Sequence, residues 1–421
     1  MGVRLSEFAR GVTAETAFAV LARARDLKAR GKDVVELEIG DSPFPTTAHA
    51  RQAGIQAIEE GQTFYGPSQG LPEFRAVAAE FVRREFGIPA GPENIVVGPG
   101  AKIFETLFCE AFLDPGDGVL IFTPQFPTYV PNVQRRGARY RLVPLKEDRQ
   151  FRPDPAAVAR FLKEDPRPRA IFLNSPHNPT GGVALREDLE AIAELVRGTE
   201  TVVFSDEPYC HMAWSAPHCS ILSLDGMLDH AVAAFTFSKS YSMSGWRLGF
   251  AVMSTEYVET FTRLVNTSLS CVPPFIQRAG IAALLHDGDE RDRNMAAFRR
   301  KVERLVKGLA EIPGVSVCMP GGTFYVFPNF MRVCNDLGIT SHGLAMYLLE
   351  GASPEFGVAC LGGECFGGAG AGYLRFSCAE PDERIDQAVA FIQEAIRRHD
   401  AVRSYLESHP EYRLTAPYPC C

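Results

Sequence analysis

The chain has 421 residues, of which 46% are hydrophobic, and a formal net charge of −8. This length allows large hydrophobic cores and predicts two domains by the usual size of a domain. The acidic balance without a long basic tract argues against nucleic acid as the main partner. No apolar run approaches the roughly 20 residues of a membrane-spanning helix, and the N-terminus lacks an apolar signal core, so we expect a cytoplasmic protein without a membrane partner.

Seven short apolar runs alternate mostly with helical patterns through the first two thirds of the chain. The runs cover residues 95–97, 119–122, 140–144, 170–173, 202–205, 232–237 and 248–253. They are continuous rather than alternating, which is typical of strands buried on both faces of a sheet. The sequence therefore predicts an α/β fold with a mainly parallel seven-stranded sheet between helices, and such sheets bind ligands at the carboxyl ends of their strands.

The first of these runs leads into a glycine-rich turn, residues 98–102, and then into a helical pattern at 103–112. Backbone N–H groups at the start of a helix are free, and together with the helix dipole they can hold a phosphate. We expect Gly100, Ala101 and Lys102 to supply these groups. Without further signals, such a turn would be an ordinary loop.

Two later runs are followed by polar residues that could belong to a site. The run at 170–173 leads to Asn178, which Pro179 biases toward extended backbone, and the run at 202–205 ends at Asp206, with Tyr209 three residues on. Asp and Tyr after a strand are also ordinary turn residues. Their position at strand ends makes them candidates for a site.

Lys239 follows the run at 232–237 and lies near Ser238 and Arg247. Apolar walls and a second cation disfavour a lysine ammonium, so its pKa falls and the free amine can form a Schiff base with an aldehyde. The hydroxyl and the guanidinium suit a phosphate. A solvated surface lysine is the ordinary alternative.

These parts are those that a pyridoxal phosphate site requires. The cofactor acts as an electron sink only while its ring nitrogen stays protonated, and a buried carboxylate, here Asp206, favours the protonated form. Tyr209 and Asn178 are candidates for contacts to the 3-oxygen of the ring from opposite sides.

Three linked motifs resemble the class I/II aminotransferases among the fold-type I pyridoxal phosphate enzymes. They are Asn-Pro-Thr-Gly at 178–181, Ser-Asp-Glu-Pro-Tyr at 205–209, and the segment from Ser238-Lys239 to Gly245-Trp246-Arg247. The resemblance extends from about residue 35 to 397 and implies a homodimer with shared active sites. It implies that Tyr65 reaches the partner's cofactor phosphate, that Phe126 covers the cofactor ring, and that Arg375 binds the substrate α-carboxylate, with a backbone contact from Gly40.

The reaction implied is a ping-pong transamination between an L-amino acid and a 2-oxo acid, in which Lys239 is both anchor and base. Lys102 is a candidate contact for an acidic substrate side chain, as in aspartate or 2-oxoglutarate, because residues 266–272 contain no arginine; alternatively it only starts a helix and points to solvent. A lyase reaction such as β-elimination on the same scaffold is the main rival, and a binding module without catalysis is disfavoured by the intact lysine.

A long helical stretch at 277–312, with a break at 287–289, is expected to carry the chain between domains. We predict an N-terminal arm and helix at 1–45 that join the small domain, a large cofactor-binding domain at 46–288 and a small α+β domain at 289–421, with a loosely packed tail from residue 405. Cys210, His211, His218 and Cys219 lack the paired spacing of a zinc site, so no metal is expected. The eleven cysteines are read as thiols in a reducing compartment.

Overall fold

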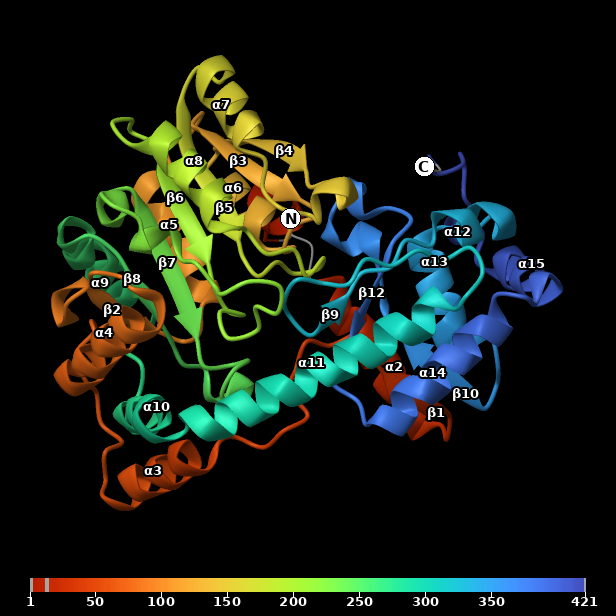
Figure 1. Cartoon of the computed structure of the whole chain (residues 1–421), viewed down its shortest axis with the longest axis horizontal. Coiled ribbons are helices and arrows are strands. Elements are labelled where there is room, and N and C mark those ends of the chain that lie inside the picture. The colour runs from red at the N-terminus through yellow and green to blue at the C-terminus, as the bar shows by residue number, and fades with distance from the viewer. Residues whose placement is uncertain (1–2, 12–14, 420–421) are drawn as a thin grey trace.

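The computed structural model describes residues 3–11 and 15–419, and its two lobes are joined along one side by the long helix α11 (Gly288–Ala310) (Figure 1). Residues 1–2 and 12–14 of the expected N-terminal arm, and residues 420–421 of the tail, lie outside the described residues. Within the described ranges, no helix combines the length and apolar character needed to cross a membrane.

The larger lobe contains a seven-stranded sheet in the order β2-β8-β7-β6-β5-β3-β4. Its strands are β2 (Ile95–Gly98), β3 (Gly118–Thr123), β4 (Arg139–Pro144), β5 (Pro168–Asn174), β6 (Val202–Asp206), β7 (Ala231–Thr236) and β8 (Gly249–Val252). Strand β8 is antiparallel to both of its neighbours, and all other pairs are parallel. The predicted mainly parallel seven-stranded sheet is confirmed.

Alternate residues of every strand except β4 enter two separate cores, one on each face of the sheet. Strand β4 lies at the edge and is partly exposed, with Tyr140 and Leu142 at 40% and 39%, so the prediction of burial on both faces is not met for the run at 140–144. In β6, Val202 and Phe204 join one core and Val203 joins the other. The first core includes residues of α5 (Lys102–Phe112), α6 (Tyr129–Arg135) and α9 (Thr255–Leu269). The second includes residues of α4 (Pro72–Phe86), α7 (Pro155–Glu164), α8 (Arg186–Val196) and α10 (Pro274–His286). Helices therefore cover both faces, as the continuous apolar runs predict.

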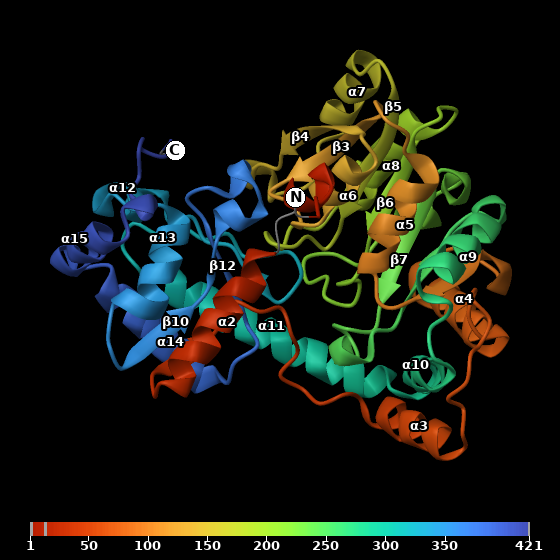
Figure 2. The same cartoon turned by 180° about the vertical axis from the view of Figure 1, so that it is seen from behind.

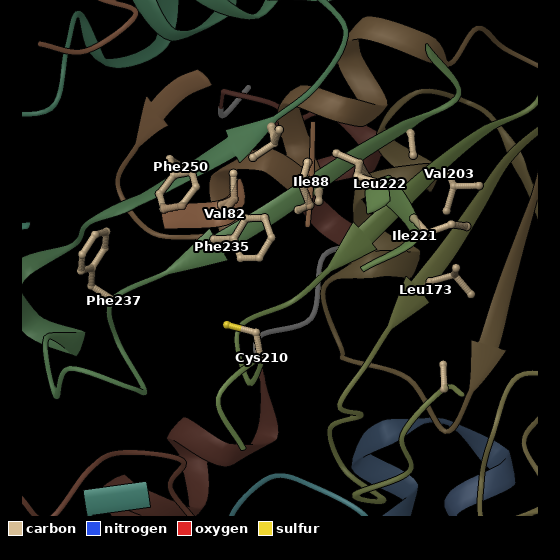
Figure 3. Packing of buried hydrophobic residues seen from close by; sticks show 14 of the residues in the cluster. Val82, Ile88, Leu173, Val203, Cys210, Ile221, Leu222, Phe235, Phe237 and Phe250 are labelled. Carbon is tan, nitrogen blue, oxygen red and sulfur yellow. The ribbon is translucent and has the colours of Figure 1, made fainter. Parts of the chain in front are cut away.

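Figure 3 shows part of the second core at close range. Phe235 of β7 and Phe250 of β8 stack with ring centroids 5.3 Å apart, and the side chain of Val82 from α4 lies beside them. Burial of aromatic side chains between the sheet and a helix helps to fix the position of neighbouring strands relative to one another. The strand ends that carry the polar residues are thereby held in register.

The smaller lobe is built from both ends of the chain. Strand β1 (Asp33–Glu36) pairs in parallel with β10 (Phe356–Ala359), and β9 (Tyr325–Val326), β12 (Leu374–Ser377) and β11 (Leu361–Gly362) form an antiparallel sheet in the order β11-β12-β9. Its helices include α2 (Thr16–Ala29), α12 (Met331–Leu337), α13 (Ser341–Met346), α14 (Asp382–Ala395) and α15 (His399–Ser408). Figure 2 shows α2 in this lobe, whereas α1 (Glu7–Gly11) lies against α6 of the larger lobe, with Phe8 beside Arg135. The division at residues 46 and 289 stays a prediction.

The predicted break near Asp287 separates α10 from α11. The Asp287 carboxylate accepts hydrogen bonds from the backbone N–H groups of His49 and Ala50 at the start of α3 (Ala48–Glu59). Helix α3 packs on α10. The expectation of a loosely packed tail is wrong for its first residues, whereas most side chains of residues 410–419 are exposed. Tyr405 is buried, and the Tyr418 hydroxyl lies 2.8 Å from a carboxylate oxygen of Glu364, because aromatic side chains in the tail find apolar and polar partners on the smaller lobe.

Candidate active site

The candidate residues of the larger lobe lie at the ends of three adjacent central strands, β5, β6 and β7. Asn174 ends β5 and its Oδ1 accepts the backbone N–H of Asn178 at 2.9 Å, Asp206 ends β6, and Lys239 follows β7 by three residues. Because parallel strands end at the same edge of a sheet, these residues share one edge.

Asp206 is a buried carboxylate with one strong hydrogen bond. Its Oδ2 accepts from the Tyr129 hydroxyl at 2.6 Å, and Tyr129 begins α6 on the face of the sheet that Val202 and Phe204 also face. Burial, with a smaller contribution from nearby Glu207, raises the pKa of Asp206 to about 7, against the opposing effects of the Tyr129 hydrogen bond and Lys102. A positive group in contact with Asp206 would favour the ionised carboxylate.

The Lys239 amine is half-buried and donates to the backbone carbonyl of Gly40, and it lies 5.8 Å from the ring centroid of Phe324. Gly40 has no room for a side chain, because a Cβ atom there would lie 1.8 Å from the Tyr325 hydroxyl. That hydroxyl is also 3.2 Å from the hydroxyl of Tyr209. Through Tyr325, the structure brings Gly40, Tyr209 and Lys239 together.

Arg375 on β12 connects the two lobes. Its guanidinium donates to Asn178 Oδ1 at 3.0 Å and to the backbone carbonyl of Glu38. It also lies over the ring of Tyr325, 4.2 Å from its centroid, and over Phe366 at 4.9 Å. These contacts hold a largely buried cation in one orientation, which suits two parallel hydrogen bonds to a carboxylate.

Glu38 lies next to this arginine and was not predicted as a site residue. Its side chain is fully buried, and neither carboxylate oxygen has a hydrogen-bond partner in the part of the chain that the structure describes. Burial raises the pKa of Glu38 to about 7. A buried acid of this kind is costly in its charged form.

The glycine-rich turn forms a cradle at the start of α5. Gly100 has a φ of +88°, and a Cβ atom there would lie 2.6 Å from Nη2 of Arg247, which donates to the carbonyl of Pro99 at 2.9 Å. Ala101 precedes Lys102, the first residue of α5, and Ser238 is buried with its hydroxyl 2.9 Å from that of Thr236. A guanidinium, a hydroxyl and the start of a helix therefore come from separate parts of the chain.

Phe126 and Lys102 lie together beside this cradle. The Lys102 amine is 5.1 Å from the centroid of the Phe126 ring, and that ring contacts Tyr129 edge-on with centroids 5.8 Å apart. Lys102 also forms an ion pair with Glu15, which comes from the N-terminal segment. Tyr65, in contrast, is 89% exposed and is not brought into the group.

The four Cys and His residues after Tyr209 take part in hydrogen bonding beneath the site. His211 Nδ1 lies 3.0 Å from the Ser240 hydroxyl and its Nε2 lies 3.0 Å from the Arg291 guanidinium, and His218 Nε2 lies 2.7 Å from a carboxylate oxygen of Glu207. Among residues 3–11 and 15–419, no cluster of three or more His, Cys, Asp or Glu side chains is placed to hold a metal ion.

Sequence reasoning missed several residues that complete the group, namely Glu15, Glu38, Tyr129, Tyr325 and Phe366. Each of them meets its partner only through the tertiary fold, as Tyr129 meets Asp206, 77 residues later in the chain, so no local pattern marks them.

Comparison with known proteins gives a consistent result. The sequence model described as aminotransferase class I and II matches residues 32–392. The chain is 35% identical over 379 residues to the aspartate aminotransferase of Pyrococcus abyssi, covering 88% of this chain and 94% of that protein. It is 32% identical over 386 residues to aromatic-amino-acid aminotransferase 2 of Thermococcus litoralis, covering 90% and 95%. The solved structure of the Thermus thermophilus aspartate aminotransferase with maleate superposes with a TM-score of 0.86 at 30% identity, covering 94% of this chain and all of that one.

Proposed function

This chain belongs to the class I and II aminotransferase family, and we propose that it uses pyridoxal 5′-phosphate to move an amino group from an L-amino acid to a 2-oxo acid by a ping-pong mechanism. One observation carries the proposal. The side chains of Lys239, Asp206 and Arg375 lie within one connected set of contacts at the strand ends. Arg375 reaches Asp206 through Asn178 and Asn174, whose side chain donates to the Asp206 carbonyl at 2.8 Å. It reaches Gly40, the carbonyl partner of Lys239, through Tyr325. The three side chains carry the charges that amino-group transfer on this cofactor requires.

The residues fit the cofactor. The Gly100 cradle leaves backbone open at the start of α5, and Gly100, Ala101, Lys102, Ser238 and Arg247 are placed to hold a phosphate. Asp206 and Tyr209, with Asn178 and Phe126, would hold the ring. When bound, pyridoxal phosphate supplies an aldehyde for an amine and a ring that accepts an electron pair.

Each residue then has a definite task. Arg375 binds the substrate carboxylate with its guanidinium fork, aided by Asn178 and by the backbone of Gly40, and so orients the Cα–H bond. In the half-reaction that consumes the amino acid, the Lys239 amine would take the proton from Cα and hold it as an ammonium; in the half-reaction that consumes the oxo acid, the ammonium would return a proton to Cα. Asp206 keeps a proton on the ring nitrogen, and the buried aromatic ring of Tyr325 helps to exclude water.

For the substrates, we propose aspartate and 2-oxoglutarate as the first pair to test, with Lys102 meeting the distal carboxylate. Support comes from the relatives, two of which are named aspartate aminotransferases, one of them solved with the dicarboxylate maleate. Lys102 does start α5, as the alternative reading expects, but it pairs with Glu15 and lies against Phe126 rather than extending freely into solvent. The relatives do not favour the lyase alternative, because those compared here are named aminotransferases.

We further propose a homodimer with shared sites in the cytoplasm. Tyr65 and its neighbour Phe64 are 89% and 82% exposed, and Ile55 and Ile58 of the preceding helix α3 are also exposed, so the segment expected to act on the partner's site carries several apolar side chains that this protomer leaves uncovered. The nine cysteines in the described residues are all free, which suits a reducing compartment.

The test is a half-reaction. The holoenzyme is mixed with single amino acids, without an oxo acid, and conversion to the pyridoxamine form is followed by absorbance while the product is analysed. We expect one 2-oxo acid per active site and no ammonia. Continuous release of ammonia and an oxo acid would instead establish the lyase. Lys163→Ala, an exposed lysine on α7, is the matched control for changes at Lys239.

A further inference from the structure

Glu15 stands at the start of α2 but does not cap it. The residue has extended backbone at the N-cap position, yet within the described residues its side chain makes no capping hydrogen bond. The carboxylate instead forms an ion pair with Lys102, 87 residues later in the chain. Its side chain is 15% exposed while that of Lys102 is 44% exposed, so the carboxylate is the more enclosed partner.

Lys102 needs a negative partner at this position. It is the first residue of α5, where the helix dipole is positive and a cation is disfavoured. Its amine lies 5.1 Å from the Phe126 ring centroid, and Phe126 contacts Tyr129, whose hydroxyl binds Asp206. The Glu15–Lys102 pair therefore lies at the outer end of a chain of contacts that runs from Phe126 to the buried carboxylate.

We propose that Glu15 is a specificity-determining residue that competes with a substrate side-chain carboxylate for Lys102. This inference rests on the proposed function, in which one pocket receives both an amino acid and a 2-oxo acid. When the bound substrate is dicarboxylic, its distal carboxylate replaces Glu15 on Lys102. When the bound substrate has an uncharged side chain, Glu15 remains and balances the ammonium. The pocket thus accepts a dicarboxylic substrate in one half-reaction and an uncharged one in the other.

The exposure of Lys102 makes this exchange feasible. Its side chain is 44% exposed, so a substrate carboxylate can reach the ammonium, and an ion pair with one partner open to water is less stable than a fully buried one. A fully buried pair would not yield, because separating it would leave an uncompensated buried charge. Glu15 consequently lowers the apparent affinity for dicarboxylic substrates without abolishing it.

A purely structural role for the pair predicts a different outcome. Other contacts also attach the N-terminal segment, including that of Phe8 with the Arg135 guanidinium, 5.7 Å from the ring centroid, and the ion pair of Arg23 on α2 with Glu350 at 2.6 Å. These contacts remain when Glu15 is changed to glutamine. A loss of attachment would affect all substrates alike, whereas competition for Lys102 separates them by charge.

The experiment compares Glu15→Gln, Lys102→Met and the double variant with wild type, using the holoenzyme. Glu7→Gln, an exposed glutamate of the same segment, is the matched control. Half-reaction kcat/KM is measured for aspartate and for phenylalanine, and maleate binding is followed by cofactor absorbance. We expect Glu15→Gln to raise kcat/KM for aspartate and the affinity for maleate by about 10-fold, the scale of one charge-assisted hydrogen bond, and to lower kcat/KM for phenylalanine.

Lys102→Met should lower kcat/KM for aspartate by roughly 10- to 100-fold and should remove the effect of Glu15→Gln in the double variant. Equal changes for aspartate and phenylalanine, unchanged maleate affinity in Glu15→Gln, or a gain that persists in the double variant would each overturn the inference. Failure of wild type to transaminate any donor would overturn the proposed function instead, and maleate binding would still decide the role of Glu15.

Discussion

Replacing Glu38 by glutamine should stabilise the protein at alkaline pH and have much less effect at acidic pH. Glu38 is fully buried beside Arg375, and burial raises its pKa to about 7. In the unfolded chain an ordinary glutamate has a pKa of about 4.3. Between these two values the unfolded chain has released the Glu38 proton while the folded protein retains it. Stability therefore falls as pH rises through this window and becomes level above it.

The size of the effect follows from the gap between the two pKa values. At about 1.36 kcal/mol per pH unit, a folded-state pKa of about 7 corresponds to about 3 kcal/mol lost between pH 4 and pH 8. Glutamine does not titrate. The difference in unfolding free energy between Glu38→Gln and wild type should thus shift by about 2 kcal/mol in favour of the variant between pH 5 and pH 8. Any constant cost of burying the amide cancels in this comparison.

Urea unfolding at pH 5, 6, 7 and 8, at one protein concentration and with the same cofactor content, measures this difference. Asp206 titrates in both proteins, so its contribution cancels as well. Glu194→Gln, an exposed residue on α8, reports the general effect of removing one carboxylate. A difference between Glu38→Gln and wild type that is the same at pH 5 and pH 8 would refute the reasoning.

Three further predictions concern the site itself. Lys239→Ala should abolish the covalent link that borohydride fixes between protein and cofactor and should cut turnover by several orders of magnitude; a reducible link at full turnover would contradict its assignment. Mixing Tyr65→Phe/Arg247→Ala subunits with Lys239→Ala subunits should restore partial activity through hybrid sites, whereas a fully active monomer in sedimentation would exclude sharing. Gly40→Ala places a Cβ atom 1.8 Å from the Tyr325 hydroxyl and should cost about 1–3 kcal/mol in urea unfolding, with partial recovery in Gly40→Ala/Tyr325→Phe, where the nearest remaining ring carbon is 2.9 Å away.

The sheet could be predicted from the sequence because most of its strands are apolar runs followed by polar residues, whereas the edge strand β4 contains Arg139 and Arg141 and is only partly buried. Asp206 and Asn178 were found for the same reason, since parallel strands deliver their ends to one edge. Glu15 and Glu38 could not be found in this way. The partner of Glu15 is 87 residues away, and Glu38 reads locally as one acid among several near β1. Such contacts depend on how the N-terminal segment lies against the rest of the fold, and this placement cannot be predicted from the spacing of residues in the sequence.

The division of β6 between two cores restricts how this protein can change in length during evolution. The side chains of Val202 and Phe204 lie on the same face of the sheet as Tyr129, which donates a hydrogen bond to the Asp206 carboxylate. The side chain of Val203 lies on the other face. Deleting one residue within β6 would move each later side chain of the strand to the opposite face of the sheet. Asp206 would then point away from Tyr129, and the core residues that follow the deletion would exchange cores. Insertions and deletions compatible with the site are therefore confined to the loops away from the carboxyl ends of β5, β6 and β7.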